Sequence, residues 1–152
     1  MKTTLTLLVF IITSTLVFGQ LKFNTGSSEL DADINSINTT AKADLSLYKK
    51  DLSVEFSVSL KEIDALFALK LEPGDVYLSL EIGKITGNKP SIVAQTYSKN
   101  KSKGWGAIAN EMGIKPGSTE FHQLKDDSKN KKSKSNKGNS GNKYNGQGNK
   151  KK

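Results

Sequence analysis

The sequence predicts one all-α domain, a small bundle of five or six helices, between a signal peptide and a disordered C-terminal tail. Three observations lead to this prediction. Apolar residues recur every three or four positions through much of residues 28–125, which is the period of an amphipathic helix. Glycine, proline and capping residues separate these periodic segments. The 152-residue chain contains no cysteine, so its stability must come from an apolar core rather than from disulfides.

Residues 1–19 have the pattern of a secretory signal peptide. One positive charge precedes an apolar stretch over residues 5–18, which is too short to span a membrane. Val17 and Gly19 are small enough to precede a cleavage site, so we expect cleavage before Gln20. An uncleaved N-terminal anchor is the alternative. The protein is therefore expected to be exported, to the periplasm or the extracellular space.

A long amphipathic helix is expected from about residue 29 to residue 53, after a short polar leader at residues 20–27. Ser28 is a suitable N-cap, and the helix could break at the Thr39–Thr40 pair. We expect the helix to pack one face on the core, with a coiled-coil dimer seam as the alternative. The apolar positions form a single stripe: Leu30, Ile34, Ile37, Ala41, Leu45, Tyr48 and Leu52.

The middle of the chain contains several helix boundaries. Ser59 and Glu62 have the spacing of a capping box, and a turn at residues 72–75 can begin the next helix. That helix has apolar residues on two sides, which indicates the buried centre of a bundle. Gly87 is suited to end it, and Pro90 is suited to the first turn of its successor. Residues 52–58 are a weak strand candidate.

Residues 103–125 contain the only Trp and the only His of the chain. Trp105 begins an apolar helical face, which is followed by Gly113 as a helix end and Ser118 as a cap. Packing therefore explains most of this stretch, and the residues that packing leaves as a possible binding patch are Gly104, Trp105, Gly106 and His122. Gly106 is unfavourable inside a helix, which suggests that another group approaches there.

The sequence does not indicate catalysis, a cofactor or a metal site. His122 has no titratable partner at a catalytic spacing, and no nucleophile elbow, zinc-protease or P-loop motif occurs. Residues 31–38 begin like a calcium loop, but Ser36 and Lys42 stand where such a loop needs Gly and Glu. Residues 104–114 weakly resemble the start of a helix-turn-helix, but no basic recognition helix follows. We therefore expect neither an enzyme nor a sequence-specific nucleic-acid reader.

The positive charge lies in the C-terminal part of the chain. Residues 20–127 contain 13 Lys and 15 acidic residues, a balance of −2, and every basic residue of the chain is Lys. Residues 126–152 are almost devoid of apolar side chains and are predicted to be a disordered tail. Lysines attract polyanions without reading a sequence. The candidate polyanion-binding residues are Lys129, Lys131, Lys132, Lys134, Lys137, Lys143, Lys150, Lys151 and Lys152.

Two stretches together resemble a family of small exported bacterial proteins. These are GDVYLSLEIGKITG and the longer KGWGAIANEMGIKPGSTEFHQLK. The family pattern is similar to GWGxIAxx(L/M)GIKPGSxxFHxLK, which here covers residues 104–125, and the overall resemblance covers about residues 28–125. It implies an exported, all-helical domain and implies no particular activity.

These observations predict a non-enzymatic helical domain at residues 28–125 that binds or organises a partner at the cell envelope. The partner would be an envelope protein or an anionic surface polymer, and the basic tail would tether the domain to anionic surfaces, including the membrane periphery. The alternative is an extracellular protein that binds nucleic acid or acidic polysaccharide through the tail, without sequence specificity.

Overall fold

A computed structural model describes residues 23–140, and every regular element in that range is helical. The all-α prediction is confirmed, but seven α-helices and one 3₁₀ helix replace the expected five or six helices. The elements are α1 Ser28–Ala43, α2 Leu45–Phe56, α3 Leu60–Phe67, α4 Pro73–Thr86, α5 Pro90–Lys99, η1 Lys101–Lys103, α6 Gly104–Glu111 and α7 Thr119–Ser140.

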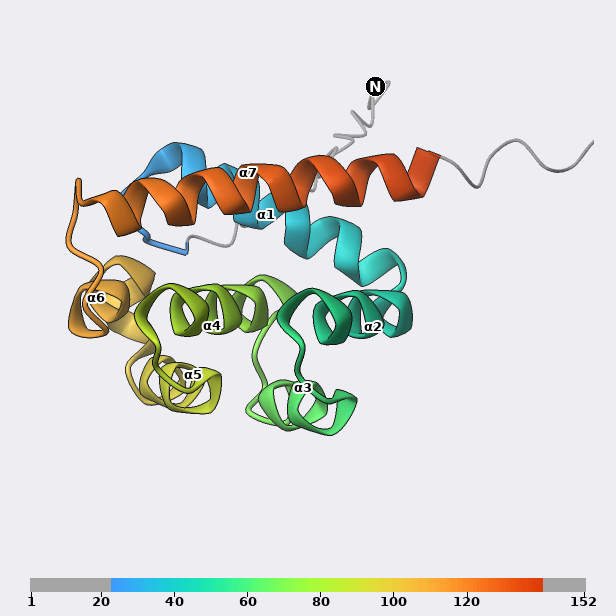
Figure 1. Cartoon of the computed structure of the whole chain (residues 1–152), viewed down its shortest axis with the longest axis horizontal. Helices are drawn as coiled ribbons and strands as arrows, with labels where there is room; N and C mark the ends of the chain where they lie inside the picture. Colours follow the sequence, from blue (N-terminus) through green and yellow to red (C-terminus); the bar gives the residue numbers. More distant parts are fainter. Residues whose placement is uncertain (1–22, 141–152) are drawn as a thin grey trace, which may run out of the picture.

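Helix α4 forms the centre of the molecule (Figure 1). It packs against α1 and α7 on one side and against α3 and α5 on the other. An unbroken run from Pro73 to Gly83 is buried, so the prediction of a central helix with two apolar sides is confirmed. Within it, Val76, Tyr77 and Leu78 have no exposed surface.

Most of the predicted helix boundaries are correct. Ser59 and Glu62 form a capping box, in which the Ser59 backbone N–H donates to the Glu62 carboxylate at 3.0 Å. Gly87 ends α4 with a φ of 75°, and Pro90 opens α5. The first helix is capped by Ser27, one residue before the predicted Ser28. Capping follows local side-chain chemistry, so it can be predicted from sequence.

The expected helix over residues 29–53 is two helices, and the break lies at Asp44 rather than at the Thr39–Thr40 pair. The Asp44 carboxylate accepts a hydrogen bond from the Leu47 backbone N–H at 2.9 Å and so caps α2. Thr39 instead bonds back to the Asn35 carbonyl within α1, which leaves the helix continuous there. Residues 52–56, part of the weak strand candidate, are helical.

The folded domain extends beyond the predicted residues 28–125 at both ends. Phe23 and Thr25, placed in the polar leader by sequence, are 3% and 5% exposed. Residues 126–140, placed in the disordered tail, continue α7, and Lys132 and Asn136 of this stretch contact Asp33 and Thr40 of α1. The signal peptide, its cleavage site before Gln20 and the tail beyond Ser140 lie outside the described residues. Within the described range, no helix is both long enough and apolar enough to cross a membrane.

Candidate functional site

Trp105, the first residue of the predicted patch, is a core side chain. It is 1% exposed, and its indole N–H donates to the Asp75 carboxylate at 2.8 Å. Its ring stacks on Tyr97, with 4.0 Å between the ring centroids. Burial raises the pKa of Asp75, while the hydrogen bonds from Trp105 and from the Glu72 backbone oppose that rise. The Trp105 indole therefore provides the buried Asp75 carboxyl with a hydrogen-bond donor.

The two glycines beside Trp105 admit the chain's own N-terminal segment. The backbone N–H groups of Trp105 and Gly106 donate to the carbonyls of Phe23 and Asn24 at 2.8 and 2.7 Å. A Cβ on Gly106 would lie 2.9 Å from the Thr25 carbonyl oxygen, and a Cβ on Gly104 would collide with Asn24. Gly104 also has a φ of 76°, which disfavours other residues. Residues 23–25 are therefore the group that approaches Gly106.

His122 is exposed near the start of α7, and its backbone N–H donates to the Ser118 carbonyl at 3.1 Å. Because Gly104 and Trp105 are buried while His122 is exposed, the four residues do not form one accessible patch.

The lysines of α7 fall into two groups. Lys131 is 6% exposed, and its ammonium contacts the Glu55 carboxylate on α2 at 2.6 Å. Lys132 pairs with the buried Asp33 on α1. The predicted polyanion-binding residues that remain exposed in the described part of the tail are Lys129, Lys134 and Lys137. Lys143, Lys150, Lys151 and Lys152 lie outside the described residues.

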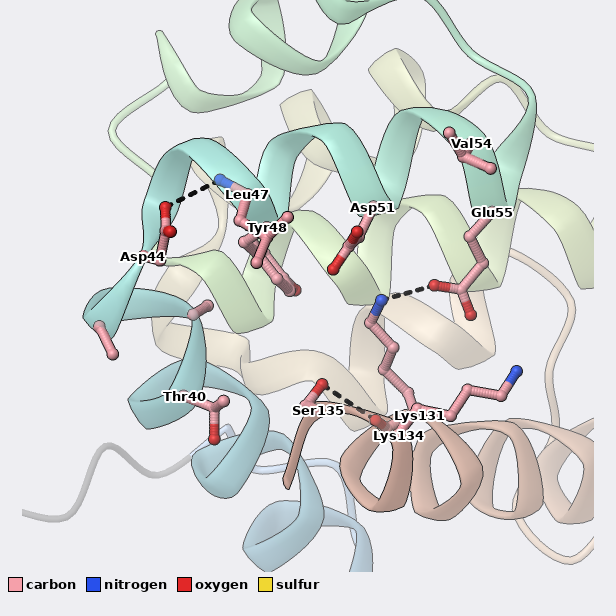
Figure 2. A pocket seen from close by; sticks show the side chains of 12 residues that line it. Thr40, Asp44, Leu47, Tyr48, Asp51, Val54, Glu55, Lys131, Lys134 and Ser135 are labelled. Carbon is pink, nitrogen blue, oxygen red and sulfur yellow. Dashed lines mark hydrogen bonds and ion pairs between the residues drawn. The ribbon is translucent and has the colours of Figure 1, made fainter. Parts of the chain in front are cut away.

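An open cleft of about 690 Å³ separates α2 from the C-terminal half of α7 (Figure 2). Two apolar side chains on its α2 wall are exposed to solvent, Leu47 by 54% and Val54 by 81%. Asp51 points from α2 toward α7, and no ion pair to it occurs among residues 23–140. The remaining lining residues are Thr40, Ala41, Ala43, Asp44, Tyr48, Glu55, Lys131, Lys134 and Ser135.

The cleft walls carry opposite charges. The α2 wall and its cap contribute the carboxylates of Asp44, Asp51 and Glu55, whereas α7 contributes Lys131 and Lys134. At the base of the cleft, the Tyr48 hydroxyl donates to a backbone carbonyl at 3.1 Å. Burial raises the pKa of Tyr48 far above its usual value, and the nearby acids add to the rise. The cleft therefore combines exposed apolar side chains with acidic and basic groups, of which Glu55 and Lys131 pair with each other.

A second polar cluster joins α4 to α7. Lys84 contacts the carboxylates of Glu81 and Asp127 at 2.6 and 3.1 Å. Burial raises the pKa of Glu81, which is 1% exposed, to about 7, and Asp127 adds to the rise. Although burial opposes it, hydrogen bonding to Glu81 and Lys84 holds the pKa of Asp127 below its usual value. Carboxyls with divergent pKa values also occur in catalytic sites, but Glu81 does not line the cleft.

The acidic residues of the calcium-like stretch have other partners. Asp31 accepts hydrogen bonds from the backbone and the hydroxyl of Thr25 at 3.0 and 2.7 Å, and Asp33 pairs with Lys132. Within residues 23–140, no group of three or more His, Cys, Asp or Glu side chains could hold a metal ion.

Sequence reasoning missed both the cleft and the cluster at Glu81. One signal for the cleft was present: Leu47 and Val54 are apolar, seven residues apart and outside the main stripe of the helix, with an acid between them. The cluster at Glu81 had no local signal, since its members are up to 46 positions apart.

Comparison with known proteins finds no matching family model, no matching curated protein and no matching solved structure.

Proposed function

We propose that this protein is an exported, non-enzymatic binding module of the bacterial cell envelope, which holds a segment of a partner protein in the cleft between α2 and α7. The observation that carries the proposal is the exposure of Leu47 and Val54 beside Asp51, which forms no ion pair with any residue of the described range 23–140. Exposed apolar side chains surrounded by polar and charged groups are typical of protein-binding surfaces. The signal-peptide pattern of residues 1–19 and the family resemblance support the envelope location.

The basic C-terminal segment would tether the module to anionic lipid or polymer. Only the exposed lysines are available for this role in the described part of α7, because Lys131 and Lys132 are held by acids of the domain. Each lysine near an anionic surface contributes up to about 1 kcal/mol, and the contribution falls within a Debye length. The tether is therefore expected to be salt-sensitive, unlike the apolar contact in the cleft.

Capture from an envelope extract tests the proposed cleft. The full chain should retain one envelope protein at both low and high salt, and a Leu47→Ser/Val54→Ser double variant should lose it. Ile92→Ser is the matched control, because Ile92 is 49% exposed on α5, outside the cleft. Equal capture by all three chains would contradict the assignment of the cleft.

The alternative function, binding of nucleic acid or acidic polysaccharide through the basic segment, rests on the exposed Lys129, Lys134 and Lys137. Replacement of Lys129, Lys134 and Lys137 together by Gln should then lower heparin or DNA retention at low salt, and removal of residues 141–152 with their four lysines should lower it further. A shorter chain that ends at Lys125 is unsuitable for this test, because it removes the packed part of α7 as well.

A further inference from the structure

We propose that the chain's own C-terminal segment, residues 141–152, occupies the cleft between α2 and α7 in the free protein, with Tyr144 against Leu47. The segment would then compete with a partner until an anionic polymer draws it away. This role as a competitor rests on the proposed function of the cleft, whereas the docking itself does not.

The direction of α7 brings its end to the correct part of the cleft. Thr40, four residues before the Asp44 cap of α2, hydrogen-bonds to Asn136 at 3.4 Å, whereas Glu55 near the end of α2 contacts Lys131. The two helices therefore run in opposite directions along the cleft (Figure 2). The last turn of α7 lies toward the end of the cleft that holds Leu47.

The distances are short enough for the segment to turn back. Ser135 lines the cleft and Ser140 ends α7, so the helix extends beyond the lining by about 7.5 Å at 1.5 Å per residue. Tyr144 is four positions after Ser140, and four residue steps can span up to about 13 Å. Gly141 and Asn142 are the residue types that most readily reverse a chain after a helix.

The chemistry of the segment complements that of the cleft. Its sequence, GNKYNGQGNKKK, contains one aromatic residue and four lysines and no acid. The Tyr144 ring can cover the exposed apolar surface of Leu47, and the adjacent Lys143 can pair with Asp51. The covalent link gives the segment an effective concentration of millimolar order, so weak contacts are sufficient for docking. Polymers that bind Lys150, Lys151 and Lys152 would favour release.

Paramagnetic broadening in the full chain tests the docking. The chain contains no cysteine, so Gln147→Cys provides a single site for a nitroxide label. We expect the amide signals of Leu47 and Asp51 to lose intensity relative to the reduced label, while the signal of Ile92 does not. Tyr144→Ser should abolish the loss, and Asn145→Ser, the neighbouring control, should preserve it. Excess heparin should restore the signals.

Three results would overturn the inference. One is full intensity at Leu47 and Asp51 with the oxidised label, and another is broadening that survives Tyr144→Ser. The third is broadening that appears only between labelled and unlabelled molecules in a mixture, which would assign the cleft to a second copy of the chain. None of these three results depends on the capture of an envelope protein. If the segment docks in the cleft but the chain captures no partner, the proposed function is contradicted and the docking inference is not.

Discussion

The buried carboxyl of Glu81 predicts an unusual dependence of stability on pH. Replacement by Gln keeps the size of the side chain and removes its titration. Burial raises the pKa of Glu81 from 4.5 to about 7, so between these values the folded state binds more protons than the unfolded state. The free energy of unfolding must therefore fall as pH rises through this window. This contribution is fully present below pH 4.5 and is lost as pH rises through 7.

The magnitude follows from the displacement of the pKa. A rise from 4.5 to about 7 corresponds to a loss of about 3 kcal/mol, which is an upper value because Lys84 and Asp127 can rearrange around the charge. A loss of that size is a large fraction of the stability of a small domain. Groups with lowered pKa values, such as Glu62 and Glu29, act below pH 4.5, where their contribution is lost as pH falls.

Urea unfolding of the wild type and of Glu81→Gln from pH 5 to pH 8 measures the effect. The stability of the wild type should fall across this range, and that of the variant should fall less, by up to about 3 kcal/mol. Glu111→Gln is the matched control, because Glu111 is an exposed acid on α6, and it should follow the wild type. Parallel curves for wild type and Glu81→Gln would refute the reasoning.

Two further variants test the packing at the ends of the domain. Gly106→Ala should destabilise the domain by about 1 kcal/mol or more, because the new Cβ would lie 2.9 Å from the Thr25 carbonyl oxygen. Helix propensity alone predicts the opposite, a gain in stability of about 1 kcal/mol. Thermal unfolding distinguishes the two, and a gain in stability would show that residues 23–25 do not dock there. Lys131→Met should lower the free energy of unfolding by about 1–3 kcal/mol, because it leaves Glu55 without its partner at 2.6 Å. The exposed Lys134→Met should change it by less than about 0.5 kcal/mol, and equal losses in urea unfolding would contradict the docking of α7 through Lys131.

The predicted inward face around Trp105 illustrates what sequence reasoning can achieve. Its period placed Trp105, Ile108 and Ala109 inside, and each is less than 5% exposed. The sequence marks Gly104 and Gly106 as unusual but does not indicate their partner, since residues 23–25 are about 80 positions away in a stretch that resembles a polar leader. A glycine that is unfavourable in a helix can be recognised from the local sequence, whereas the group that approaches it cannot.

The sequence alone determined that the domain is helical and where most helices begin and end, because helical periodicity and capping depend on residues within one or two turns. The extent of α7 and the position of the cleft depend on tertiary contacts, which the sequence pattern does not show. Residues 126–140 have too few apolar side chains to predict a packed helix, yet the domain supplies Asp33 and Glu55 as partners for Lys132 and Lys131. Asp33 is 99 positions from Lys132 and Glu55 is 76 positions from Lys131, so no local pattern distinguishes a lysine that docks a helix from one that faces solvent.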